Sequence, residues 1–171
     1  MVGLGLALAS LSRLSASTAH ANAVPHGIAA SDGYVGDRVV TAYDVDEPAI
    51  ARLDPQLRSA LRRATSDAAE QGVHVRVNSG WRSRAYQRLL FAEAVTKYGD
   101  ARRAREWVNT PSASTHVTGD AVDVGPPEAA HWLGAHGSAY GLCQVYANEP
   151  WHFELLTRAG GSCPPPRRHV D

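Results

Sequence analysis

Residues 114–123 read Ser-Thr-His-Val-Thr-Gly-Asp-Ala-Val-Asp and place a histidine and two aspartates around one glycine. His116 falls in a polar stretch that predicts a turn, whereas residues 121–124 alternate like a strand that presents Asp123 on one face. Gly119 lets the backbone reverse tightly between them. We therefore expect His116 and Asp123 to lie close together in the folded protein.

A second histidine follows much later, in the sequence Glu-Pro-Trp-His at residues 149–152. Catalytic zinc is normally held by three protein ligands with water in the fourth position, and a nearby carboxylate accepts a proton from that water. The sequence therefore offers Glu149 as the base. The expected zinc ligands are His116, Asp123 and His152.

The second motif carries a geometric constraint. Residues 151–156 alternate between apolar and polar side chains, which predicts a strand with His152 and Glu154 on the face opposite the core. In a regular strand Glu149 and His152 would face opposite ways, so both can reach one metal only if the strand is irregular. Pro150 can provide the irregularity because proline has no backbone N–H to donate.

These motifs resemble those of the VanY-like family, zinc D-alanyl-D-alanine carboxypeptidases that trim bacterial peptidoglycan stem peptides. The family pattern is Ser-x-His-x-x-Gly-x-Ala-x-Asp followed by Glu-x-Trp-His. Its fixed positions are filled here by Ser114, His116, Gly119, Ala121, Asp123, Glu149, Trp151 and His152. Residues 79–83, Ser-Gly-Trp-Arg-Ser, and the later Gln87 are similar to a further family element. The resemblance covers roughly residues 40–157, with a departure at residues 109–113, where Pro-Gly often precedes the first motif.

The resemblance implies a role for each of these residues. The zinc ligands would be His116, Asp123 and His152. Glu149 would activate zinc-bound water, and Arg82 would stabilise the oxyanion at the scissile carbonyl, which suits the fixed donor fork of arginine. Gln87 and Ser114 would bind the terminal D-alanine. The implied partner is a stem peptide ending in D-Ala-D-Ala.

Several alternatives fit parts of this pattern. Glu154 and Asp120 compete for polar roles near the metal, and Arg82 could instead form a salt bridge within its loop. A stem-peptide endopeptidase would use the same metal chemistry on an internal bond. A non-catalytic, zinc-stabilised cell-wall binding module is the alternative from another class. Glu149 and Arg82 argue against such a module, because a binder needs neither a base nor an oxyanion clamp.

Length and composition predict one modest domain. The chain has 171 residues, 44% of them hydrophobic, which suffices for a single core. Its 17 basic and 17 acidic residues give a formal net charge of zero. We expect no nucleic-acid partner, because binding phosphates requires a concentrated basic surface. The sequence does not set the oligomeric state.

The two ends of the chain differ from its middle. Residues 1–23 combine an apolar run with an alanine-rich end, which predicts a secretory signal peptide, the alternative being an unprocessed tail. The run is too short for a stable membrane span. Residues 24–39 are assigned to an N-terminal segment that can be flexible, residues 40–163 to the zinc D,D-carboxypeptidase domain, and residues 164–171 to an exposed C-terminal tail. The expected location is secreted or associated with the cell envelope.

Cys143 and Cys163 are the two cysteines of the chain. A pair of cysteines in an exported protein predicts a disulfide, and zinc–thiolate binding is the weaker interpretation because neither lies beside a ligand motif. Closing a loop of about 20 residues would stabilise the fold by roughly 3 kcal/mol. The bond would also hold the C-terminal tail near the strand that carries His152.

The predicted fold class is α+β, a small antiparallel sheet with helices packed on one face and the zinc site on the other. Helices are expected after the capping residues Asp54, Ser83 and Asp100, and over residues 127–136. Strands are expected at residues 73–77, 121–124, 143–146 and 151–156.

Overall fold

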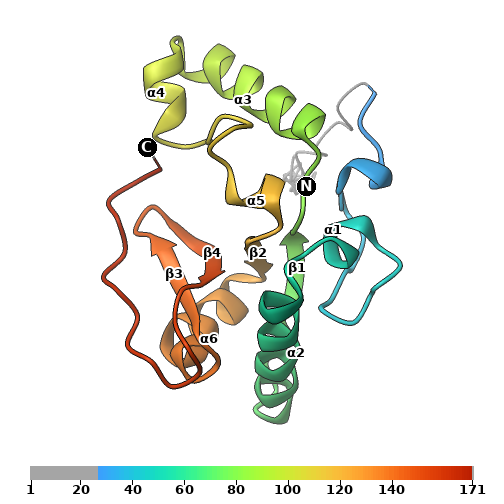
Figure 1. Cartoon of the computed structure of the whole chain (residues 1–171), viewed down its shortest axis with the longest axis vertical. Coiled ribbons are helices and arrows are strands. Elements are labelled where there is room, and N and C mark those ends of the chain that lie inside the picture. Colours follow the sequence, from blue (N-terminus) through green and yellow to red (C-terminus); the bar gives the residue numbers. More distant parts are fainter. Residues whose placement is uncertain (1–26, 171) are drawn as a thin grey trace, which may run out of the picture.

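A computed structural model describes residues 27–170 of the chain (Figure 1). The predicted signal peptide at residues 1–23 lies outside the described residues. Among the helices that are described, none has the length and apolar character needed to cross a bilayer.

Four antiparallel strands form the sheet, in the order β1-β2-β4-β3. They are β1 (Arg76–Ser79), β2 (Ala121–Gly125), β3 (Leu142–Tyr146) and β4 (Glu149–Leu155). The open sheet combined with helices confirms the predicted α+β class. The two central strands, β2 and β4, carry two of the three candidate metal ligands, Asp123 and His152.

The two long helices begin at the capping residues expected from the sequence. The Asp54 carboxylate accepts hydrogen bonds from two backbone N–H groups at the start of α2 (Pro55–Glu70). The Ser83 hydroxyl accepts one hydrogen bond, from the backbone N–H of Tyr86, at the start of α3 (Arg84–Tyr98), which ends at Gly99 with a φ of 86°. The shorter helices are η1 (Ala30–Asp32), α1 (Pro48–Ala51), α4 (Ala101–Arg105), α5 (Thr115–Thr118), α6 (Pro127–His136) and η2 (Gly137–Tyr140).

The hydrophobic core lies between the sheet and the helices α2 and α6, which both contact β4 (Figure 1). Val122 of β2 and Phe153 of β4 are register partners, and both are fully buried in this core. Because side chains alternate along a strand, the next pair, Asp123 and His152, points to the opposite face. The core therefore fixes the direction in which two candidate ligands point.

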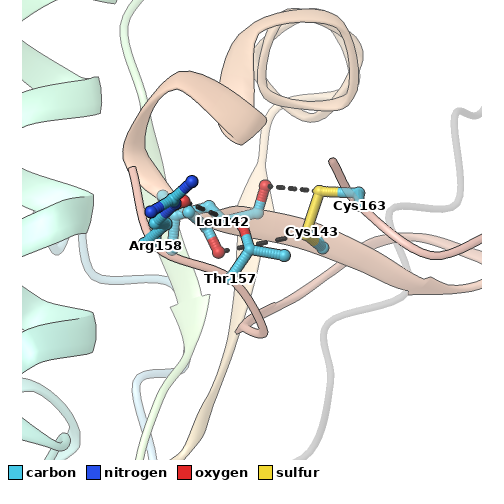
Figure 2. The surroundings of a disulfide bond; sticks show 6 residues. Leu142, Cys143, Thr157, Arg158 and Cys163 are labelled. Atoms are coloured by element: carbon cyan, nitrogen blue, oxygen red, sulfur yellow. Dashed lines mark hydrogen bonds between the residues drawn. A yellow bond between two sulfur atoms is a disulfide. The ribbon is translucent and has the colours of Figure 1, made fainter. Parts of the chain in front are cut away.

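The segments at both ends of the described chain pack on this domain. Val35, within the N-terminal segment, is buried in the core cluster. At the other end the predicted disulfide between Cys143 and Cys163 is present, with Cα atoms 5.5 Å apart (Figure 2). Pro164 to Arg168 are exposed, as expected of a tail, but Val170 is buried against β3.

Candidate active site

The candidate metal ligands come from three elements. Asp123 of β2 and His152 of β4 lie opposite each other in the sheet, and α5 carries His116. The chain reverses between α5 and β2 at Gly119, whose φ is 87°. A Cβ atom there would lie 2.3 Å from the carbonyl oxygen of Arg52, so only glycine fits this turn.

Three ligand atoms converge on one point. Oδ1 of Asp123 lies 3.0 Å from Nδ1 of His152 and 3.3 Å from Nε2 of His116, and the two ring nitrogens are 3.3 Å apart. All three residues are buried, and their ligand atoms lie within 4.8 Å of one another. Asp120, the competing carboxylate, is exposed and does not belong to this cluster.

Hydrogen bonds on the far side of each ring fix which nitrogen faces the cluster. Nδ1 of His116 lies 2.8 Å from the carbonyl oxygen of Gly80, which can only accept, so we assign the ring proton to Nδ1 and the lone pair to Nε2. Nε2 of His152 lies 3.1 Å from Oε1 of Glu154, which leaves Nδ1 to face Asp123. Glu154 is itself held by the hydroxyl of Thr115 at 2.9 Å. Ligating histidines are usually oriented in this way.

This set of donors fits a catalytic zinc ion. Two imidazole nitrogens and one carboxylate oxygen are among the ligand combinations that hold zinc with a coordination position left for water or substrate. The donors are buried, and each ring nitrogen that would bind the metal is opposite a nitrogen already engaged by an acceptor. The residues therefore match the ion in type, number and orientation.

Burial and charge act differently on the two histidines. The pKa of His116 is lowered, chiefly by burial and also by the Arg82 charge, which keeps its ring neutral. Burial alone would lower the pKa of His152, but its hydrogen bonds to Asp123 and Glu154 raise it to about 9. His152 is therefore protonated at neutral pH when no metal is bound.

Arg82 is held by three side chains around the cluster. Its Nη2 donates to Oδ2 of Asp123 at 2.6 Å, and its Nε donates to Oγ of Ser79, also at 2.6 Å. Its Nη1 donates to Oε1 of Gln87 at 3.2 Å. The guanidinium thus lies against a metal-ligand candidate and lines the cavity, so it can face substrate while it orients Asp123.

Glu149 lies beside the candidate metal ligands. Its Oε2 is 3.9 Å from Nδ1 of His152. The register between β3 and β4 shifts between Gln144 and Tyr146, at the end of β4 that carries Glu149, and this provides the irregularity required for Glu149 and His152 to meet. Burial, together with the Asp123 charge, raises the pKa of Glu149 to about 7. A carboxylate with such a pKa is suited to exchange protons near neutrality.

The two predicted substrate-binding residues differ in their surroundings. Gln87 is buried, and its amide oxygen accepts from Arg82 while its amide nitrogen donates to the carbonyl oxygen of Asn109 at 2.8 Å. Ser114 is also buried and lines the cavity at the start of α5. Gln87 thus contacts Arg82 directly, whereas Ser114 faces the space where a ligand would lie.

The candidate metal ligands and the predicted catalytic and substrate-binding residues line one cavity of about 540 Å³. Its polar part contains Arg82, Gln87, Ser114, Thr115, His116, Asp123, Glu149 and His152. Its remaining walls include the apolar side chains Leu90, Ala94, Trp107, Val108 and Val170. The size is within the range that holds a drug-sized ligand, and the mixture of polar and apolar walls is typical of a substrate pocket.

Several residues of the site have roles that their place in the sequence does not indicate. The Gly80 carbonyl, Thr115 and Asn109 act through tertiary contacts that a sequence pattern does not reveal. Glu154 is the exception, because strand alternation places it on the same face as His152.

Comparison with known proteins shows which family this chain resembles. A profile of the VanY family, described as D-alanyl-D-alanine carboxypeptidase, matches residues 50–157, more than half of the chain. A curated D-alanyl-D-alanine carboxypeptidase of Enterococcus faecalis (strain ATCC 700802 / V583) is 27% identical over 142 residues, which cover 67% of this chain and 53% of that protein. The chain therefore spans about half the length of this relative.

Solved structures show the same relationship. A mutant of the vancomycin-resistance D,D-pentapeptidase VanY from a VanB-type cassette, in complex with Zn(II), has a TM-score of 0.57 at 26% identity, covering 61% of this chain and 73% of that chain. VanYB in complex with D-alanine-D-alanine has a TM-score of 0.57 at 25% identity, with coverage of 61% and 72%. The LdcB LD-carboxypeptidase, at 24% identity and a TM-score of 0.55, covers 76% of this chain and 70% of its own and shares the fold.

Proposed function

Because the chain belongs to the VanY family of D-alanyl-D-alanine carboxypeptidases, we propose that it removes the terminal D-alanine from peptidoglycan stem peptides in a zinc-dependent reaction. The observation that carries the proposal is the convergence of His116, Asp123 and His152 within 4.8 Å, with the Glu149 carboxylate 3.9 Å from His152. The proposed partner is a stem peptide ending in D-Ala-D-Ala, the dipeptide bound in the VanYB structure.

The metal would be held by Nε2 of His116, Oδ1 of Asp123 and Nδ1 of His152. Zinc bound in such a site lowers the pKa of water and polarises a carbonyl group. The chain supplies the orientation of the ligands, through Gly80 for His116 and through Glu154 for His152.

Glu149 is proposed as the general base. Its carboxylate lies at the edge of the ligand cluster and lines the same cavity, so it can take a proton from the attacking water and deliver it to the leaving amine. Its pKa is raised to about 7 before any cation is bound, and a nearby cation favours the carboxylate form that accepts the proton from water. Glu154 is excluded from this role by geometry, because it accepts hydrogen bonds from His152 and Thr115 behind the ring.

Arg82 is proposed to stabilise negative charge as it develops on the scissile carbonyl oxygen. Its guanidinium is fixed by Ser79, Gln87 and Asp123, so little reorganisation is needed when the oxyanion forms. Ser114 and Gln87 are proposed to bind the terminal D-alanine portion of the substrate. Both line the cavity, and Gln87 also accepts a hydrogen bond from Arg82.

Export is part of the same proposal. A peptidoglycan substrate lies outside the cytoplasmic membrane, and the disulfide is of a kind that persists in oxidising compartments. We therefore place the protein outside the cell or at the cell envelope, with residues 1–23 as the leader and residues 40–163 as the catalytic domain.

The test is incubation of the zinc-loaded protein with a defined pentapeptide stem ending in D-Ala-D-Ala, followed by mass analysis of the products. We expect loss of one D-alanine. Glu149→Gln should retain zinc but lose activity by about 10²–10⁴-fold, the usual size of a general-base contribution. Glu93→Gln is a matched control, because Glu93 lines the same cavity without belonging to the ligand cluster.

Other outcomes would redirect the proposal. Cleavage at an internal stem bond would identify an endopeptidase. Binding of peptidoglycan by the wild type without any cleavage would favour the non-catalytic module. Release of D-alanine by Glu149→Gln at close to the wild-type rate would remove Glu149 from the role of base.

A further inference from the structure

The family match ends at residue 157, yet the chain returns to the substrate cavity thirteen residues later, at Val170. Val170 is only 3% exposed and lines the same cavity as Glu149 and His152. Residues 164–170, which we call the C-terminal strap, thus contribute Val170 to the site although they lie outside residues 50–157, which match the family profile.

The C-terminal strap is fastened to β3 in two ways. The disulfide from Cys163 to Cys143 anchors its beginning, and Figure 2 shows this bond beside the Leu142 backbone. Further on, Arg167 pairs with the edge of β3, donating its N–H to the carbonyl oxygen of Val145 and accepting from the N–H of Ala147, both at 2.8 Å. In Figure 1 the chain then continues past β3 toward α4. The strap therefore follows a defined path to the cavity.

Val170 is linked to the metal-ligand candidates through one aromatic residue. It forms a small buried cluster with Val145 and Tyr146 of β3. The ring of Tyr146 lies 5.1 Å from the ring of His152, and both residues line the cavity. Tyr146 and Val170 therefore form a continuous piece of cavity wall that begins beside His152.

Part of the cavity lining is apolar, in contrast to the side chains around Arg82. It includes Val170 and Trp107, and Trp107 is stacked on Tyr98 with ring centroids 5.7 Å apart. A cavity of about 540 Å³ has room for more than the two terminal residues of a stem peptide. The polar part can take the terminal D-alanine, so a longer substrate would lie against the apolar wall.

We propose, on the basis of the function proposed above, that the C-terminal strap is a substrate-selecting wall and that Val170 contacts the stem peptide on the side preceding the scissile bond. The strap then favours an extended peptide over the bare D-Ala-D-Ala dipeptide. Val170 is already buried in the free protein, so it acts by shaping this wall and by van der Waals contact with substrate; its truncation weakens peptide binding and leaves the proton transfers at Glu149 unaffected.

The test compares full-length wild type with Val170→Ala and with a chain ending at Cys163, which keeps the disulfide. Each is assayed on a pentapeptide stem and on the D-Ala-D-Ala dipeptide, and its zinc content is measured. Loss of the two methyl groups at Val170 should raise KM for the pentapeptide about 2- to 5-fold with kcat unchanged, because van der Waals contacts with substrate are lost. The chain ending at Cys163 should show a larger increase in KM for the pentapeptide. KM and kcat for the dipeptide should stay the same in both variants. Arg168→Ala is the matched control, because Arg168 is exposed on the same strap.

Two results would overturn the proposal. One is an equal decrease in kcat/KM for the pentapeptide and the dipeptide, which would mean that the strap only supports the fold. The other is an unchanged KM for the pentapeptide in Val170→Ala, a variant that decides the question even if the shortened chain does not fold.

The proposal can fail independently of the proposed function. Calorimetric binding of both peptides to zinc-loaded Glu149→Gln, with and without Val170→Ala, needs no turnover. A preference for the pentapeptide that disappears with Val170→Ala supports the strap even if wild type cleaves neither peptide. A preference that Val170→Ala leaves intact refutes it even if wild type proves to be a carboxypeptidase.

Discussion

Nε2 of His152 lies 3.1 Å from Oε1 of Glu154, on the edge of the ring opposite the Nδ1 that faces Asp123. Glu154 is buried and comes two residues later on the same strand, so this contact is built into β4. The carboxylate orients the ring and increases its basicity toward a metal.

We predict that Glu154→Gln weakens zinc binding by about 10- to 100-fold, the usual effect of losing an outer partner of a ligating histidine. Competition with a chromophoric chelator at about pH 9, where proton competition at His152 is small, measures the change in zinc affinity. Glu128→Gln, a change at an exposed glutamate of α6, should leave the affinity as it is. Equal zinc affinities in wild type and Glu154→Gln would show that the contact does not support the metal.

Arg82 gives a second prediction, because its fork contacts Asp123, Ser79 and Gln87 at once. Lysine keeps the charge but cannot reproduce three directed contacts. Arg82→Lys should lower kcat on the pentapeptide by about 10²–10³-fold, as loss of an oxyanion donor does in other hydrolases. Arg88→Lys, an exposed change on α3, is the control. A kcat close to wild type would reduce Arg82 to a structural salt bridge.

The parts of the fold that follow from local chemistry could be predicted from the sequence. Asp54 and Ser83 are side chains that cap helices, and both helices begin directly after them. Alternation along residues 151–156 placed His152 and Phe153 on opposite faces, as β4 shows. These features depend on neighbouring residues alone, so no tertiary information was needed.

Other features depend on contacts between distant segments. The strand expected at residues 73–77 begins at Arg76, because only from there does it pair with β2. A register shift then brings Ser79 opposite Asp123, and this places Arg82 within reach of a carboxylate 41 residues away. No local pattern encodes such a shift. The return of Val170 to the cavity likewise depends on pairing with the edge of β3.

The raised pKa of His152 yields a third prediction, about the pH dependence of zinc binding. Burial favours the neutral ring, but the hydrogen bonds to Asp123 and Glu154 outweigh it and raise the pKa to about 9. Zinc binds only the neutral nitrogen, so binding near pH 7.5 should release about one proton, and affinity should rise roughly tenfold per pH unit until about pH 9.

Calorimetry of zinc binding in buffers of different ionisation enthalpy measures the proton release. The same titration of Glu154→Gln should release less, because one of the groups that raise the pKa of His152 has lost its charge. Binding without proton release at pH 7.5 would contradict the protonated state assigned to His152.

The last prediction concerns Glu149 in the metal-free protein. Burial and the Asp123 charge raise the pKa of Glu149 from 4.5 to about 7, so the folded protein binds this proton more tightly than the unfolded chain does. The contribution of this proton to the free energy of unfolding is complete below about pH 4.5 and is lost as the pH rises through about 7.

Glu149→Gln removes this titration. The free energy of unfolding of the metal-free variant, taken relative to that of wild type, should therefore increase by about 1–2 kcal/mol from pH 5 to pH 8, after allowance for partial exposure to solvent. Urea unfolding at the two pH values measures the difference, with Glu93→Gln as control. With zinc added, wild type should be more stable than Glu149→Gln, because a nearby cation favours the charged carboxylate. A variant that follows the wild-type pH dependence without metal would show that Glu149 is not held in the environment that suits it to act as a base.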